Sequence, residues 1–150
     1  MAKTDQTTLT AGTELASQLR FAVMRLSRRL RQHAPEDITP SQLSALSVIV
    51  RDGPMTLSQL AVAERVQPPT ITRIADALQQ KGLASRTPSE LDRRVAYVEA
   101  TAAGRALVET IRRSRDAYLA ARLRTFSAEE RAVLARAASL LERLVEDPQS

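Results

Sequence analysis

The stretch Thr56–Thr101 decides the fold, and it reads TLSQLAVAERVQPPTITRIADALQQKGLASRTPSELDRRVAYVEAT. It begins with a threonine followed three residues later by a glutamine, a capping-box spacing that predicts a short helix. After a turn, two consecutive prolines open a second helix, because a proline in the first helical turn loses no hydrogen bond. Gly82 ends that helix, since glycine takes the left-handed backbone of this position without steric cost. Leu83–Thr87 and Arg94–Ala100 then predict two strands joined by a turn.

The second helix of this stretch, predicted over residues 68–81, has one apolar and one polar face. Its apolar residues recur at three- and four-residue steps and form the buried face: Ile71, Ile74, Ala75 and Leu78. The outward face is formed by Pro69, Thr72, Arg73 and Asp76, with Thr70 and Ala77 on one flank. A short helix, a turn, an amphipathic helix and a hairpin together predict a winged helix-turn-helix. In such a unit the second helix fits the DNA major groove, and a basic hairpin tip enters the neighbouring minor groove.

Further helices are predicted on both sides of this unit. The first spans residues 13–33, after a polar N-terminus that we expect to be frayed. It carries a cluster of arginines, which form either a solvated face or a set that includes phosphate or ligand contacts. Thr39 caps a buried helix that ends at Asp52, and beyond the hairpin a long helix begins at Thr101 and a final one at Ser127. The predicted fold class is mainly α, with a small β-hairpin wing.

The composition excludes several classes of function. The formal net charge of +5 and the pI of about 10.6 favour a polyanionic partner, either nucleic acid or an acidic membrane surface, and do not choose between them. The chain has no cysteine and a single histidine, His33, which excludes thiol chemistry and metal centres built on these residues. No spacing indicates a catalytic triad, paired carboxylates or a glycine-rich phosphate loop, so we predict no catalytic residues, no cofactor and no metal. Because neither a membrane-spanning run nor a signal-peptide pattern is present, we predict a cytoplasmic protein without a membrane partner.

Several motifs of the chain resemble those of MarR-type transcriptional regulators. They are VQPPTITR at residues 66–73, Asp76, Leu78, KGL at residues 81–83, DRR at residues 92–94, and Ala100, Thr101 and Gly104. The DRR triplet, at this distance from a helix that ends in KGL, is the specific part of the pattern. The resemblance covers nearly the whole chain, because the flanking predicted helices also fall in the family's order.

The resemblance implies a ligand-responsive DNA-binding regulator, normally a repressor, that binds a pseudo-palindromic operator as a homodimer. Residues 1–150 then form a single MarR-like chain. Within it, residues 39–100 are the winged helix-turn-helix DNA-binding domain, and residues 13–38 and 101–147 are dimerisation helices. Apolar stripes at both chain ends agree with this division, because one small winged domain cannot cover them.

Carried over by position, the DNA-binding residues are Pro69, Thr70, Thr72, Arg73, Arg86, Arg93 and Arg94. Arg94 is the expected minor-groove arginine, Arg86 an expected backbone contact, and Asp92 the expected wing anchor through an ion pair. Each role has a structural alternative. For Arg73 it is an ion pair with an aspartate, for the Thr72 hydroxyl a bond to the backbone, and for Arg94 a solvated loop charge. Many family members have an arginine where this chain has Ala77, so the anchor of the wing is left open.

The resemblance also implies a small aromatic or anionic effector that weakens DNA binding from a cleft between the dimerisation helices and the winged domain. Chain order gives the candidate cleft residues: Leu26, Leu46, Val50, Val108 and Arg112. The sequence identifies neither the effector nor the operator. The rival hypothesis is a winged-helix scaffold that binds protein, RNA or DNA without operator specificity.

Overall fold

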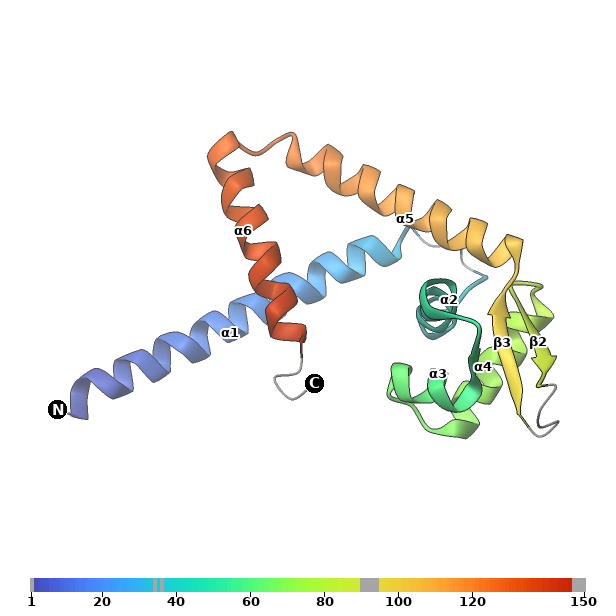
Figure 1. The fold of residues 1–150 in the computed structure, drawn as a ribbon. Coiled ribbons are helices and arrows are strands. Elements are labelled where there is room, and N and C mark those ends of the chain that lie inside the picture. Colours follow the sequence, from blue (N-terminus) through green and yellow to red (C-terminus); the bar gives the residue numbers. More distant parts are fainter. Residues whose placement is uncertain (1, 34, 36, 90–94, 147–150) are drawn as a thin grey trace. The chain divides into compact units, whose positions relative to one another are not determined.

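The computed structural model describes residues 2–33, 35, 37–89 and 95–146 (Figure 1). Its elements, in chain order, are α1 (Ala2–Arg31), α2 (Pro40–Asp52), β1 (Met55–Thr56), α3 (Leu57–Glu64), α4 (Pro68–Gln80), β2 (Ala84–Pro88), β3 (Ala96–Ala100), α5 (Ala102–Leu123) and α6 (Ala128–Val145). This is the predicted mainly helical fold with a small wing. The chain divides into two compact units, Met1–Arg112 and Arg113–Ser150. Across the described ranges, no helix combines the length and apolar character that a bilayer-spanning segment needs.

Three helices begin with the capping boxes that the sequence predicts. At the start of α2, the Thr39 hydroxyl accepts from the Gln42 N–H at 3.2 Å, and the Gln42 side chain accepts from the Thr39 N–H at 3.2 Å. The same exchange starts α3 and α6, in the pairs Thr56–Gln59 and Ser127–Glu130. Each pair satisfies backbone N–H groups that the first helical turn leaves without an intrahelical partner. The predicted starts of these helices are therefore confirmed.

The hydrophobic core lies in the winged domain and joins α2, α3, α4 and the sheet. Its largest fully buried side chains are Leu46, Ile49, Leu60, Ile71, Leu78 and Val98. On α4 the predicted inward residues Ile71, Ala75 and Leu78 are buried, and Ile74 is half-buried against the same core. Burial of apolar surface is the dominant stabilising contribution in such a domain. It therefore holds α4 by one face and leaves the other face to solvent.

The sheet has three strands in the order β1–β3–β2, and both pairings are antiparallel. The sequence predicts the hairpin of β2 and β3 but not β1, in which Met55 pairs with Val98. A strand of two residues is too short to show an alternating pattern, and its pairing depends on a partner far along the chain. β3 begins at Ala96 rather than at Arg94, which lies outside the described residues. Val98 and Ala100 face the core, as their alternation predicts.

The first helix extends further toward the N-terminus than the sequence predicts. α1 begins at Ala2, so the segment before Thr13, predicted to be frayed, is helical. No proline interrupts this segment, and once a helix has formed each further residue adds a hydrogen bond. At its other end α1 stops at Arg31, and a bond of 3.2 Å from the His33 N–H to the Leu30 carbonyl closes the following turn.

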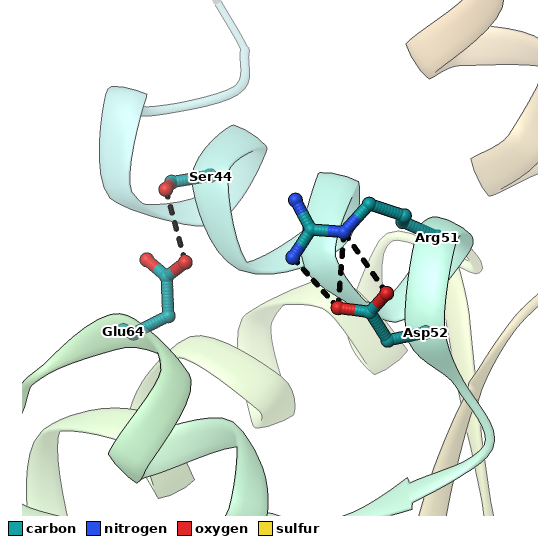
Figure 2. A network of polar contacts seen from close by, with 4 residues as sticks. All are labelled: Ser44, Arg51, Asp52 and Glu64. Atoms are coloured by element: carbon teal, nitrogen blue, oxygen red, sulfur yellow. Dashed lines mark hydrogen bonds and ion pairs between the residues drawn. The ribbon is translucent and has the colours of Figure 1, made fainter. Parts of the chain in front are cut away.

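Polar contacts on the solvent side of α2 are shown in Figure 2. The Arg51 guanidinium donates to both oxygens of the neighbouring Asp52 carboxylate, over distances of 2.6–3.0 Å. This hydrogen bonding lowers the pKa of the Asp52 carboxyl and raises that of Arg51. The Ser44 hydroxyl donates to a Glu64 carboxylate oxygen at 3.1 Å and so joins α2 to the end of α3. Exposed ion pairs contribute little to stability, so substitutions of Arg51 and Asp52 serve as controls in the DNA-binding experiments proposed for other charged residues.

Candidate nucleic-acid interface

α4 presents to solvent the face that the sequence predicts as the DNA reader. Pro69, Thr72 and Arg73 are exposed, and Thr70 is half-buried at the flank. The buried face opposite fixes the helix in the core, so these side chains are held on a rigid element. Because the first two residues of α4 are prolines, its first backbone N–H belongs to Thr70, and it bonds to the Gln67 carbonyl at 2.9 Å. Any contact of this helix with a phosphate therefore depends mainly on side chains.

Two of the predicted reading residues bond to the backbone of their own helix. The Thr72 hydroxyl donates to the Pro68 carbonyl at 3.0 Å, which is the structural alternative predicted for it. A base contact by this hydroxyl therefore requires that it rotate away from the carbonyl. The Arg73 Nε donates to the Pro69 carbonyl at 3.4 Å. Since a guanidinium has five N–H donors, Arg73 keeps further donors for a base or a phosphate.

Arg86 lies on β2, at the base of the wing, and reaches α4. Its Nη1 forms an ion pair of 2.8 Å with Asp76 Oδ1, and its Nη2 donates to the Thr72 carbonyl at 3.3 Å. The Asp76 carboxylate, which was one alternative partner for Arg73, is thus engaged by Arg86. The side chains of Arg86 and Asp76 are 23% and 46% exposed. The structure therefore places Arg86, predicted as a DNA-backbone contact, against the recognition helix.

The pairing of Arg86 with Asp76 was not predicted, although the sequence carries a signal for it. Alternate residues of a strand point to the same face, and Ala84, two residues before Arg86, is buried. Arg86 therefore starts from the core side of β2, which packs against α4. Asp76 is the one acidic residue in the sequence of α4, so it is the natural partner for an arginine on that side.

The tip of the wing lies outside the described residues. At its base, the Ser89 N–H donates to the Val95 carbonyl at 2.8 Å, which extends the hairpin beyond the paired strands. Asp92, Arg93 and Arg94 all fall in the segment outside the described ranges. The anchoring role of Asp92 and the DNA contacts of the two arginines therefore stay predictions.

The five residues predicted to line an effector cleft lie in different environments. Leu46 is 0% exposed and forms part of the core, instead of lining an open cleft as predicted. Val50 and Val108 are half-buried and pack against that core. Arg112 is exposed and donates from Nε to a glutamate one turn earlier, at 3.0 Å. Leu26 lies on α1, beside Arg25, Arg28 and Arg29 on the surface of the same helix.

Comparisons with known proteins agree with this architecture. A model of the MarR family matches residues 38–96. Mb0904, an uncharacterised helix-turn-helix-type transcriptional regulator of Mycobacterium bovis, is 42% identical over 140 residues, which cover 93% of this chain and 98% of that protein. A MarR family protein from Bacillus stearothermophilus has a similar structure, with a TM-score of 0.78 and 27% identity over 91% of this chain and 96% of that one. FabT of Streptococcus pneumoniae, solved in complex with DNA, gives a TM-score of 0.68 and 27% identity over 93% and 97% of the two chains.

Proposed function

This chain belongs to the MarR family of DNA-binding transcriptional regulators, and from that premise we propose that it binds a pseudo-palindromic operator as a homodimer and represses transcription. The observation that carries the proposal is the exposed polar face of α4, presented next to the wing while the opposite face is buried. The relative FabT, solved with DNA, supports this use of the fold. In the proposed complex α4 enters the major groove with Thr70, Thr72 and Arg73. The wing arginines Arg93 and Arg94 reach the flanking minor groove.

Where the proposed operator overlaps a promoter, a bound dimer denies polymerase access to that promoter, and this is the proposed mechanism of repression. The rival hypothesis, a scaffold without operator specificity, predicts uniform binding to any duplex. Footprinting on duplexes that the purified protein selects from a random pool separates the two. A protected palindromic site supports the operator proposal. Equal affinity for all duplexes, with only a salt-dependent component, contradicts it.

Replacing Arg94 with alanine is expected to weaken binding of the selected duplex by about 1–3 kcal/mol. The physical reason is the negative potential of a narrow minor groove, which attracts an inserted guanidinium. Fluorescence anisotropy at a fixed salt concentration measures the affinity. Arg51→Ala is the matched control, because Arg51 is an exposed arginine on α2 with a carboxylate partner of its own. Equal affinity of wild type and Arg94→Ala contradicts the proposed role of the wing.

Exposed apolar side chains on α1 and α6 support the homodimer. Among the described residues of α6 none is buried, and its exposed large apolar side chains are Val133, Leu134, Leu140, Leu144 and Val145. α1 likewise exposes Leu15, Phe21, Val23, Met24 and Leu26. Apolar patches of this extent promote association until they are covered. A second copy with the same helices covers them through a twofold-symmetric interface, which is the commonest arrangement of homo-oligomers.

Deleting the residues after Thr125 is expected to abolish the stable dimer. The deletion removes all of α6, so the partner's apolar surface has nothing to pack against and the protein becomes monomeric or aggregates. Light scattering coupled to size-exclusion chromatography measures the mass of the species in solution. The full chain at the same concentration is the control. A soluble dimer formed by the truncated chain contradicts the assignment of α6 to the interface.

A small aromatic or anionic effector is the remaining part of the proposal. On the surface of α1, Arg25, Arg28 and Arg29 lie beside Leu26 and Ala22, so this stretch of the helix is both cationic and apolar. This combination suits an aromatic carboxylate, whose charge pairs with guanidinium groups while its ring is removed from water. Benzoate is a simple probe. Release of the duplex by benzoate, but not by acetate at equal ionic strength, supports the effector, and equal release by both salts contradicts it.

A further inference from the structure

Arg86 joins the wing to the recognition helix, and we propose that it is a positioning residue that sets the distance and angle between β2 and α4. It is then an anchor of the wing rather than a contact to the DNA backbone. The consequence for DNA recognition rests on the proposed function. The anchor itself is a property of the protein without DNA.

Two bonds hold the Arg86 guanidinium against α4. Nη1 pairs with Asp76 Oδ1 at 2.8 Å, and Nη2 donates to the Thr72 carbonyl at 3.3 Å. Thr72 and Asp76 are four residues apart, so they lie on the same side of α4, where one guanidinium reaches both. Because the group is planar and uses two different nitrogen atoms, both its position and its orientation are restricted. Asp76 lies on the helix that reads DNA and Arg86 on a strand of the wing, so the bonds join the two DNA-binding elements.

Burial of Arg86 separates this role from contact with a phosphate. Its side chain is only 23% exposed. Its Nε is buried and has no hydrogen-bond partner among the residues that the structure describes. A phosphate-binding arginine presents its donors to solvent, whereas both Nη atoms of Arg86 already bond to α4. Two of its five N–H donors are therefore held by α4, and a third, on Nε, is removed from solvent.

The charge of Asp76 points to the same conclusion. A carboxylate on a helix that enters the major groove repels phosphates unless a cation neutralises it. Arg86 supplies that cation and turns a repulsive group into a structural link. Next to Asp76, Ala77 has only a methyl group and offers the wing no polar contact. With no polar side chain at that position, the polar contact between the wing and α4 is made from β2.

The spacing of the two DNA-binding elements gives the anchor its effect on operator binding. α4 and the wing reach neighbouring grooves, so the distance between them must match the distance between those grooves. A wing that moves more freely in the unbound protein loses more conformational entropy when it binds DNA. We therefore expect loss of the anchor to lower affinity for the selected duplex, although Arg86 touches no DNA.

Whether Asp76→Asn strengthens or weakens binding of the selected duplex tests the proposal. If the charge of Asp76 alone determines its effect on affinity, Asp76→Asn strengthens binding, because it removes a negative charge from a DNA-facing helix. If Asp76 holds Arg86, Asp76→Asn weakens binding of the selected duplex by roughly five- to tenfold. Arg86→Gln is expected to cause a similar loss, and the double variant little more, because both changes remove the same link. Arg86→Lys, which keeps the charge but cannot bond in two directions from one plane, restores only part of the affinity.

The salt dependence of binding provides a second measurement. Each phosphate contact contributes about 0.9 to the slope of log K against log salt concentration. If Arg86 is an anchor, Arg86→Gln should bind the duplex with lower affinity than wild type but with the same salt slope. A slope shallower by about 0.9 identifies a phosphate contact and overturns the proposal. Arg51→Gln and Asp52→Asn, which break the exposed ion pair on α2, are matched controls and should leave both affinity and slope unchanged.

Hydrogen exchange of the protein without DNA tests the anchor independently of the proposed function. The amides of residues 84–88 and 96–100 should exchange faster in Asp76→Asn and Arg86→Gln than in wild type, while the amides of α2 keep their protection. This result upholds the anchor even if no duplex is bound specifically, an outcome that would defeat the proposed function alone. Unchanged exchange of the hairpin in both variants, or tighter DNA binding by Asp76→Asn, overturns the proposal.

Discussion

Leu78→Ala is expected to lower the free energy of unfolding by about 2–5 kcal/mol. Leu78 is 0% exposed and lies on the inward face of α4, within the core of the winged domain. Truncation removes buried apolar atoms and leaves a cavity that the surrounding side chains fill only in part. Urea denaturation followed by circular dichroism measures the change.

Val62→Ala is the matched control for this substitution. Val62 is also an apolar helical residue of the winged domain, but it lies on α3 and is 78% exposed. Its replacement should change the free energy of unfolding by no more than about 0.5 kcal/mol. Equal losses in the two variants would show that burial on α4 does not hold the recognition helix in place.

Gly104→Ala is expected to destabilise the protein by about 1–3 kcal/mol, although alanine is the better helix former. Gly104 lies in the first turn of α5 and is buried. A Cβ at this position would lie 2.1 Å from the Leu83 carbonyl oxygen and 3.2 Å from Leu46 Cδ1. The first of these neighbours is backbone, which cannot rotate away as the end of a flexible side chain can. The helix or the segment before β2 has to move.

Hydrogen bonds around Thr101 make that movement costly. The Thr101 hydroxyl donates to the Gly82 carbonyl at 2.7 Å and accepts from the Gly104 N–H at 3.1 Å. The Thr101 N–H donates to the Leu83 carbonyl at 3.1 Å. These bonds tie the start of α5 to the end of α4, so shifting α5 away from Leu83 weakens them. The clash and the strained bonds therefore act together.

Thermal and urea unfolding of Gly104→Ala measure this effect, with Gly12→Ala as the control. Gly12 is inside α1, and a Cβ there would meet no atom within 4 Å. Alanine at residue 12 should therefore leave stability unchanged or raise it by about 0.5–1 kcal/mol through helix propensity. If both glycine substitutions raise stability, the close approach at residue 104 does not constrain the fold.

Most elements of the winged domain were predictable because local rules specify them. The capping boxes place the starts of α2 and α3, and beyond this domain the start of α6, since each acts within four residues. Gly82 follows α4 with a φ of 69°, as its predicted role after the helix requires. The three- and four-residue spacing of apolar residues correctly identifies the buried face of α4, and with it the exposure of Pro69, Thr72 and Arg73.

The candidate site was predictable only in part. Position along the sequence indicates that Arg86 lies near the base of the wing, but it does not say what the guanidinium touches. Its bonds to Asp76 and to the Thr72 carbonyl depend on how β2 packs against α4. Leu46 is a second example. Its place in the chain order suggested that it lines a cleft, but its packing places it in the core. Strand alternation gives the side of β2 on which Arg86 lies, but the contact itself, like the burial of Leu46, depends on neighbours contributed by other elements.

By itself, the sequence determined which helices form in the winged domain, where they begin and which face of α4 is buried. Caps and periodicity act over a few residues, so they operate before distant segments meet. Only the tertiary structure decided that β1 pairs with β3, that Arg86 pairs with Asp76 on α4, and that Leu83 leaves no room for a side chain at residue 104. Each of these depends on the packing of segments from different elements, and the free energy of that packing is not encoded in any single stretch.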